Sequence, residues 1–136
     1  MRHILRHFFL LALGAIALLA PIAHAREVTE LREQVRDGVK RTDKDLGRLI
    51  PRDKLSEPQR MRFDAAVKDL QDLTEGVTTD KWLKERDVLV RAVDNIDFLQ
   101  KNAPIEEADR QSLGIDVYTL KVILDSWKTD LGAEKQ

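Results

Sequence analysis

Apolar residues recur every three, four or seven positions through most of the chain beyond residue 26. This spacing places them on one face of an α-helix. No stretch alternates apolar and polar residues in the manner of a half-buried β-strand. Proline, glycine and polar residues separate the periodic segments and favour turns between them. The pattern therefore predicts four helices, over residues of about 27–50, 57–75, 80–102 and 104–131.

Each predicted helix carries an apolar stripe, and the four stripes together would form one core. Pro51 ends the first segment because a residue that precedes proline is driven out of the α region. Gly76 is placed to end the second segment, whereas Gly114 leaves two alternatives for the fourth, one continuous helix or a short helix followed by a long one. Short connections between helices of similar length favour antiparallel neighbours, so we expect an all-α, up-and-down four-helix bundle.

The stripes are the predicted core. They comprise Val28, Leu31, Val35, Val39, Leu46 and Leu49 in the first helix, Phe63, Ala66, Val67, Leu70 and Leu73 in the second, Trp82, Leu89, Val93 and Ile96 in the third, and Leu113, Val117, Leu120, Leu124, Trp127 and Leu131 in the fourth.

The first 25 residues follow a different pattern. Arg2 and Arg6 form a short positive region, an apolar run covers residues 8–20, and Ala23 and Ala25 are the small residues that signal peptidase requires. The run of 13 residues is shorter than the roughly 20 residues that a membrane-spanning helix needs. We therefore expect residues 1–25 to be a cleaved secretory signal peptide; the alternative is an uncleaved membrane anchor. The compact signal is typical of the bacterial general secretion route, which leads to the periplasm or the exterior.

The expected mature domain, residues 26–136, has no histidine and no cysteine, and its formal charge is −3. It therefore lacks the usual ligands for zinc, copper and haem and the usual base for a Ser or Cys nucleophile. Its charge does not favour nucleic acid. Asp94 with Asp97, and Glu106 with Glu107, are interpreted as parts of solvated helix surfaces. We expect no catalytic site, metal or other cofactor, no nucleic-acid partner, and no membrane association after signal cleavage.

The predicted fourth helix has apolar residues on two opposite sides. Ile115, Tyr118 and Val122 fall together opposite its main stripe, where a helix at the edge of a bundle is normally polar. We interpret these three residues as a surface patch that binds a protein partner or a second copy of the chain. The alternative is that residues 103–112 fold back and cover them.

A second candidate site lies at one end of the predicted bundle. Antiparallel neighbours would bring Trp82 and Trp127 to the same end of the core, with Arg86 one turn from Trp82. Arg86 could bind an anionic ligand there. The alternative is that its aliphatic stem lies along the core and its guanidinium stacks on a tryptophan.

Residues 55–59, Leu-Ser-Glu-Pro-Gln, carry two signals. Ser56 followed by Gln59 has the S-x-x-Q form of a helix capping box. The same five residues resemble the L-T-x-x-Q motif of the small helical periplasmic chaperones of the Spy/CpxP type, with Ser56 in place of threonine. Those chaperones typically carry the motif twice and are rich in methionine and basic residues, whereas this chain carries it once. The resemblance implies a chaperone-like role, and a capping box alone would produce the same letters.

These features favour an exported, non-enzymatic protein that binds a protein partner in an adaptor, chaperone-like, or inhibitor or immunity role. The alternative is a periplasmic carrier that holds a small apolar or anionic ligand within the bundle, near Trp82, Arg86 and Trp127.

Overall fold

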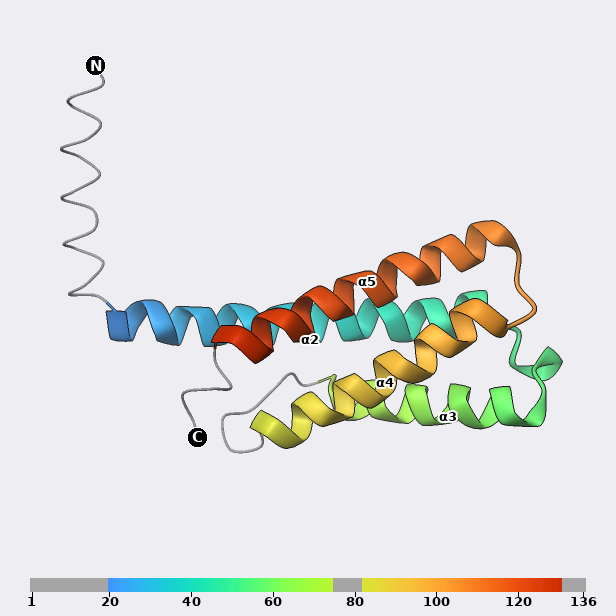
Figure 1. The fold of residues 1–136 in the computed structure, drawn as a ribbon, viewed down its shortest axis with the longest axis horizontal. Helices are drawn as coiled ribbons and strands as arrows, with labels where there is room; N and C mark the ends of the chain where they lie inside the picture. The colour runs from blue at the N-terminus through green and yellow to red at the C-terminus, as the bar shows by residue number, and fades with distance from the viewer. Residues whose placement is uncertain (1–19, 75–81, 131–136) are drawn as a thin grey trace, which may run out of the picture. The chain divides into compact units, whose positions relative to one another are not determined.

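The periodic segments form helices in the computed structural model of the chain. It describes the backbone of residues 20–74 and 82–130, and the side chains of residues 29–74 and 84–127. The elements are α2 (Ala20–Leu49), η1 (a 3-10 helix, Arg52–Lys54), α3 (Glu57–Asp72), α4 (Trp82–Asn102) and α5 (Glu107–Asp130) (Figure 1). These described residues contain four α-helices and no strand, which confirms the all-α class and agrees with a helical bundle.

Helix α2 begins earlier than the sequence predicts. It starts at Ala20 and carries Pro21 in its first turn, where the missing N–H of proline costs no helical hydrogen bond. It continues without a break past Ala25 and Arg26. The chain divides into two compact units at Glu30, and the packing described below belongs to the unit that follows. Within the described residues, no helix combines the length and the apolar character needed to cross a membrane.

The apolar stripe of α2 is buried as predicted. Thr42 lies on the same stripe and is 1 % exposed. Its hydroxyl donates to the carbonyl of Gly38 at 2.8 Å, which provides the partner that a buried hydroxyl needs. The helix ends at Leu49, ahead of Pro51. The buried apolar residues of α2 are Leu31, Val35, Val39, Leu46 and Leu49.

The capping box at the start of α3 is confirmed. The Oγ of Ser56 accepts from the backbone N–H of Gln59 at 3.3 Å, and the Oε1 of Gln59 accepts from the N–H of Ser56 at 3.0 Å. The Nε2 of Gln59 also donates to the carbonyl of Asn102, the last residue of α4, at 3.1 Å. Gln59 therefore caps its own helix and contacts the end of another. The predicted stop at Gly76 lies outside the described residues.

Helix α5 begins at Glu107, later than the sequence predicts, because Arg110 holds the preceding turn. The guanidinium of Arg110 donates to the carbonyls of Gln100, Ala103 and Ile105. Carbonyls at the end of a helix lack intrahelical partners, so this one side chain satisfies both the end of α4 and the turn after it.

Of the two alternatives for the fourth segment, the structure shows the continuous one, since α5 runs unbroken through Gly114 from Glu107 to Asp130. A Cβ added at Gly114 would lie 3.4 Å from the Nε2 of Gln100 on α4. This is an ordinary van der Waals distance, so a small side chain would also fit between α4 and α5 at this position.

Helix α4 packs beside both α3 and α5 (Figure 1). An ion pair joins it to α3, in which both donor nitrogens of Arg91 lie 2.9 Å from the two carboxylate oxygens of Asp69. Asp69 is only 5 % exposed, and the two-pronged guanidinium supplies the hydrogen bonds that a buried carboxylate requires.

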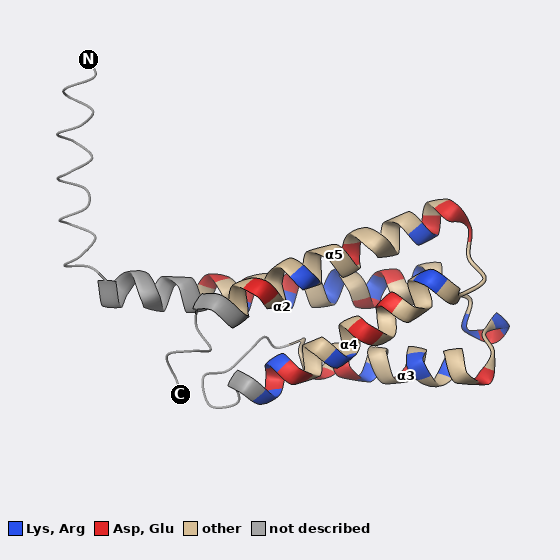
Figure 2. Cartoon of the chain, in the orientation of Figure 1, with Lys and Arg blue, Asp and Glu red and all other residues tan. Residues whose placement is uncertain are grey.

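The remaining stripe positions within the described side chains are buried, except Val67, which is half-buried. Charged residues of both signs are distributed along all four helices (Figure 2). The side chains of Val28, Trp82 and Leu131 lie outside the description. The buried residues are Phe63, Ala66 and Leu70 on α3, Leu73 directly after α3, Leu89, Val93 and Ile96 on α4, and Leu113, Val117, Leu120, Leu124 and Trp127 on α5.

Helices α2 and α5 are in close contact at Gly38. A Cβ added to this glycine would lie 3.1 Å from Cδ1 of Ile123 and 3.2 Å from Cδ2 of Leu120. Such distances are too short for a larger side chain without displacement of its neighbours. The missing side chain therefore sets how near the two helices come.

We predict that Gly38→Leu destabilises the protein by about 1–3 kcal/mol, because the added side chain overpacks the contact with α5. Gly47→Leu is the matched control on the same helix, where nothing lies within 4 Å of the added Cβ. The control should be neutral or stabilising by up to about 1 kcal/mol, because glycine is a poor helix former. Urea unfolding followed by circular dichroism measures both changes. Equal effects at the two positions would contradict the packing argument.

Candidate functional site

Three apolar side chains of α5 face outward, where the sequence placed them. Ile115 is 64 % exposed, Tyr118 70 % and Val122 46 %. The alternative that residues 103–112 cover them is therefore wrong. Because they are spaced three and four positions apart on one continuous helix, they share one face. We call these three residues the α5 face.

A hollow of about 400 Å³ adjoins the α5 face. Its walls come from α2 on one side and α5 on the other, and Tyr118 and Val122 belong to both the hollow and the α5 face. The chain thus presents exposed apolar side chains beside a concave surface. We call this hollow the α2/α5 groove, and its lining residues are Gln34, Asp37, Gly38, Arg41, Tyr118, Thr119, Val122 and Ile123.

A carboxyl pair joins α2 and α5 near the groove. Asp116 is only 3 % exposed and shares a hydrogen bond with Asp45 of α2. Burial, followed by that hydrogen bond and the charge of Asp45, raises the pKa of Asp116 to about 7. The hydrogen bond to Asp116 lowers the pKa of Asp45, and Arg48 adds to this effect. Two adjacent carboxyls cannot easily both ionise, so the pair holds one proton over a wide pH range.

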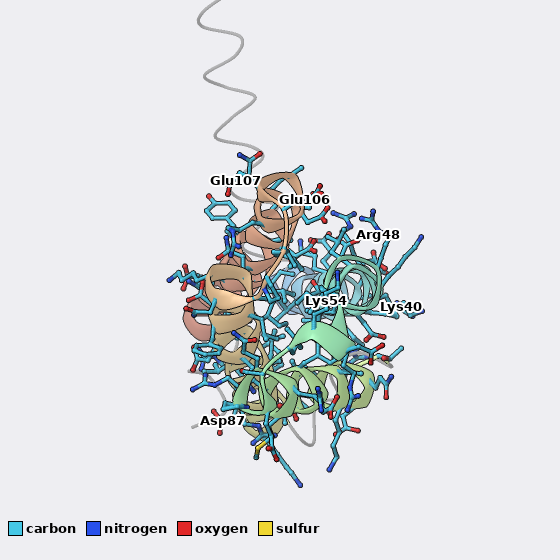
Figure 3. All side chains as sticks on the ribbon, turned by 90° about the vertical axis from the view of Figure 1, so that its right-hand side faces the viewer. Lys40, Arg48, Lys54, Asp87, Glu106 and Glu107 are labelled. Carbon is cyan, nitrogen blue, oxygen red and sulfur yellow. The ribbon has the colours of Figure 1, made fainter. Side chains whose placement is uncertain are left out.

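Two arginines of α2 set the charge around this pair. Arg48 donates to the carboxylate of Asp45 at 3.0 Å, and it lies at the surface of the bundle (Figure 3). Arg41 acts on the pKa of both carboxyls, lowering each, and it also lines the α2/α5 groove. The charge of Arg41 therefore acts on both the groove and the carboxyl pair.

The predicted ligand-binding end of the bundle is described only in part. Trp127 is 0 % exposed and is a packed core residue. Arg86 is half-buried, and its Nε makes no hydrogen bond within the described residues. The side chain of Trp82 lies outside the description, and with it the predicted proximity of the two indoles.

The other carboxylates lie at the surface. Asp94, Glu106 and Glu107 are exposed, and Figure 3 places the two glutamates just before and at the start of α5. Asp97 is half-buried and accepts from Lys101 at 3.0 Å. Across the described part of the chain, no three His, Cys, Asp or Glu residues lie together as potential metal ligands.

Sequence reasoning missed the carboxyl pair, although a signal was present. Asp116 stands three positions after Leu113 and four before Leu120, which places it on the buried side of the helix. An acidic residue at such a position requires a partner. The pattern of one helix could not identify Asp45 as that partner.

The chain was compared with protein family models, curated proteins and solved structures, and none of the three comparisons gave a match.

We predict that stability falls as the pH rises from 3.8 to about 7, the unfolded and folded pKa values of Asp116. The folded state binds this proton more tightly than the unfolded state, so deprotonation favours unfolding. The contribution of Asp116 to stability is therefore full below pH 3.8 and lost above about pH 7. Asp45 has the opposite effect on stability because its folded pKa is lowered from 3.8. Its stabilising contribution is present above pH 3.8 and is lost as the pH falls through the lowered pKa.

Asp116→Asn should remove most of this pH dependence, because a neutral amide resembles the protonated carboxyl and can donate to Asp45. Asp64→Asn is the matched control, since an exposed ion pair with Arg52 lowers the pKa of Asp64. Asp64 therefore titrates below pH 3.8, outside the interval in which Asp116 changes stability. Urea unfolding across that interval measures the slope, and an unchanged slope in Asp116→Asn would refute the assignment.

Proposed function

We propose that the protein is an exported, non-enzymatic helical protein that binds a protein partner through the α5 face and the α2/α5 groove. The observation that carries this proposal is the exposure of Ile115, Tyr118 and Val122 beside a groove that two of them line. Large apolar side chains gathered beside a concavity are typical of interaction sites.

The size of the α5 face limits the affinity that it can provide. Complete burial of one such side chain contributes roughly 1.5–3 kcal/mol, whereas association itself costs about 4–15 kcal/mol. Three side chains therefore support tight binding only when the partner also fills the groove. An amphipathic helix is suited to this, because anchors three and four positions apart fit an apolar groove between helices.

Export is the second part of the proposal, and it rests on the sequence of residues 1–25. The mature protein would be an up-and-down bundle with antiparallel neighbours. The contact between Gln59 near the start of α3 and Asn102 at the end of α4 supports that order, as does the ion pair between Asp69 and Arg91.

Cleavage after Ala25 would leave a product of 111 residues that begins at Arg26. We predict that Ala25→Arg blocks this cleavage, because signal peptidase requires a small residue at that position. His24→Arg adds the same charge one position earlier and should be cleaved normally. Intact-mass measurement of protein recovered from cells that express the full chain distinguishes the products. A wild-type protein that keeps residues 1–25 would overturn the proposed export signal.

We predict that Ile115→Asp combined with Val122→Asp abolishes partner binding, because it places two charges on the α5 face. Both side chains are exposed, so the bundle should stay folded. Met61→Asp is the matched control, since Met61 is 68 % exposed on α3. Affinity capture from an envelope extract of the source organism compares the three proteins. The proposal fails if the double variant retains the same proteins as the wild type.

A further inference from the structure

The α2 wall of the groove carries opposite charges one helical turn apart. Asp37 and Arg41 are both exposed and both line the groove. Neither Asp37 nor Arg41 forms an ion pair with another described residue. The α5 wall has a matching arrangement, with Tyr118 and Val122 also four positions apart.

The two walls are aligned at the same level along the bundle. Gly38 lies against Leu120 and Ile123, so the turn of α2 from Asp37 to Arg41 stands beside the turn of α5 that contains Leu120. The midpoint of the charged pair and the midpoint of the apolar pair therefore lie at nearly the same level along the bundle. A line that joins them runs across the groove from the α2 wall to the α5 wall.

We propose that the occupant of this surface is a second copy of the chain, related by a two-fold axis along that line. The axis would bring Asp37 of each copy opposite Arg41 of the other, and Tyr118 opposite Val122. A two-fold interface requires a surface that is complementary to itself, with each residue of a contacting pair present on both copies. Both walls of the groove meet this requirement about the same axis.

Charge complementarity favours a second copy over a partner with a strong charge of one sign. A highly acidic or basic partner would meet one attractive and one repulsive residue on α2. Tyrosine is also enriched in the cores of protein interfaces. Because a stable dimer usually buries about 1,600 Å² and this surface is small, the dimer should be weak and dependent on concentration. The inference rests on the proposed function, since it specifies which protein binds the α5 face.

Reversal of either charge tests the proposal. Sedimentation velocity over a range of concentrations measures self-association of the protein recovered from cells that express the full chain. Asp37→Arg or Arg41→Asp alone should weaken it by roughly tenfold or more, because each places like charges opposite each other at two symmetry-related contacts. Lys68→Asp on the exposed side of α3 is the control, and it should associate like the wild type.

Mixing the two single variants provides the decisive measurement. The two arginines of the Asp37→Arg chain would then meet the two aspartates of the Arg41→Asp chain, so the mixture should form a heterodimer more strongly than either variant associates with itself. Circular dichroism confirms that each variant is folded. Loss of association without recovery on mixing would overturn the two-fold pairing.

A wild-type protein that stays monomeric at every concentration would overturn the second copy as the occupant. The proposed function would survive that result if a different protein were still captured by the wild type and lost in the double variant of the α5 face. Failure of both experiments would remove the interaction surface altogether. The two proposals therefore fail separately.

Discussion

At Gly38 the backbone of α2 lies against the side chains of Leu120 and Ile123 on α5, and the features of functional interest lie around this contact. Gly38 itself lines the α2/α5 groove. Two turns further along α2, Asp45 comes within hydrogen-bonding reach of Asp116. A larger side chain at Gly38 would separate the helices, and both the groove and the carboxyl pair would change. The chain has no cysteine, so packing of this kind must hold the two helices together without a disulfide.

The carboxyl pair gives this chain a chemical property that its composition conceals. Histidine is normally the side chain whose charge changes near neutral pH, and residues 26–136 contain none. Burial transfers that behaviour to Asp116, whose pKa is raised to about 7. Arg41 lowers the pKa of this carboxyl and also lines the groove, so one side chain contributes to both features.

Most of the core could be predicted from the sequence, because burial of an apolar stripe depends on helical spacing alone. The outward position of Tyr118 followed from the same rule. The start of α5 could not be predicted, since it depends on three carbonyls that Arg110 reaches outside its own helix. Likewise the partner of Asp116 and the groove depend on which residues of α2 lie opposite α5, and the pattern within one helix does not contain that information.

Gln59 connects two helix ends that are distant in the sequence, because it caps α3 and also binds the last carbonyl of α4. Asp69 and Arg91 join the same two helices elsewhere along their length. Local opening of either helix must therefore break contacts that also hold the other. Segments linked in this way open as one cooperative unit. Amide protons of α3 and α4 would then exchange with solvent together, which makes this pair of helices a single element of the protein's native-state dynamics.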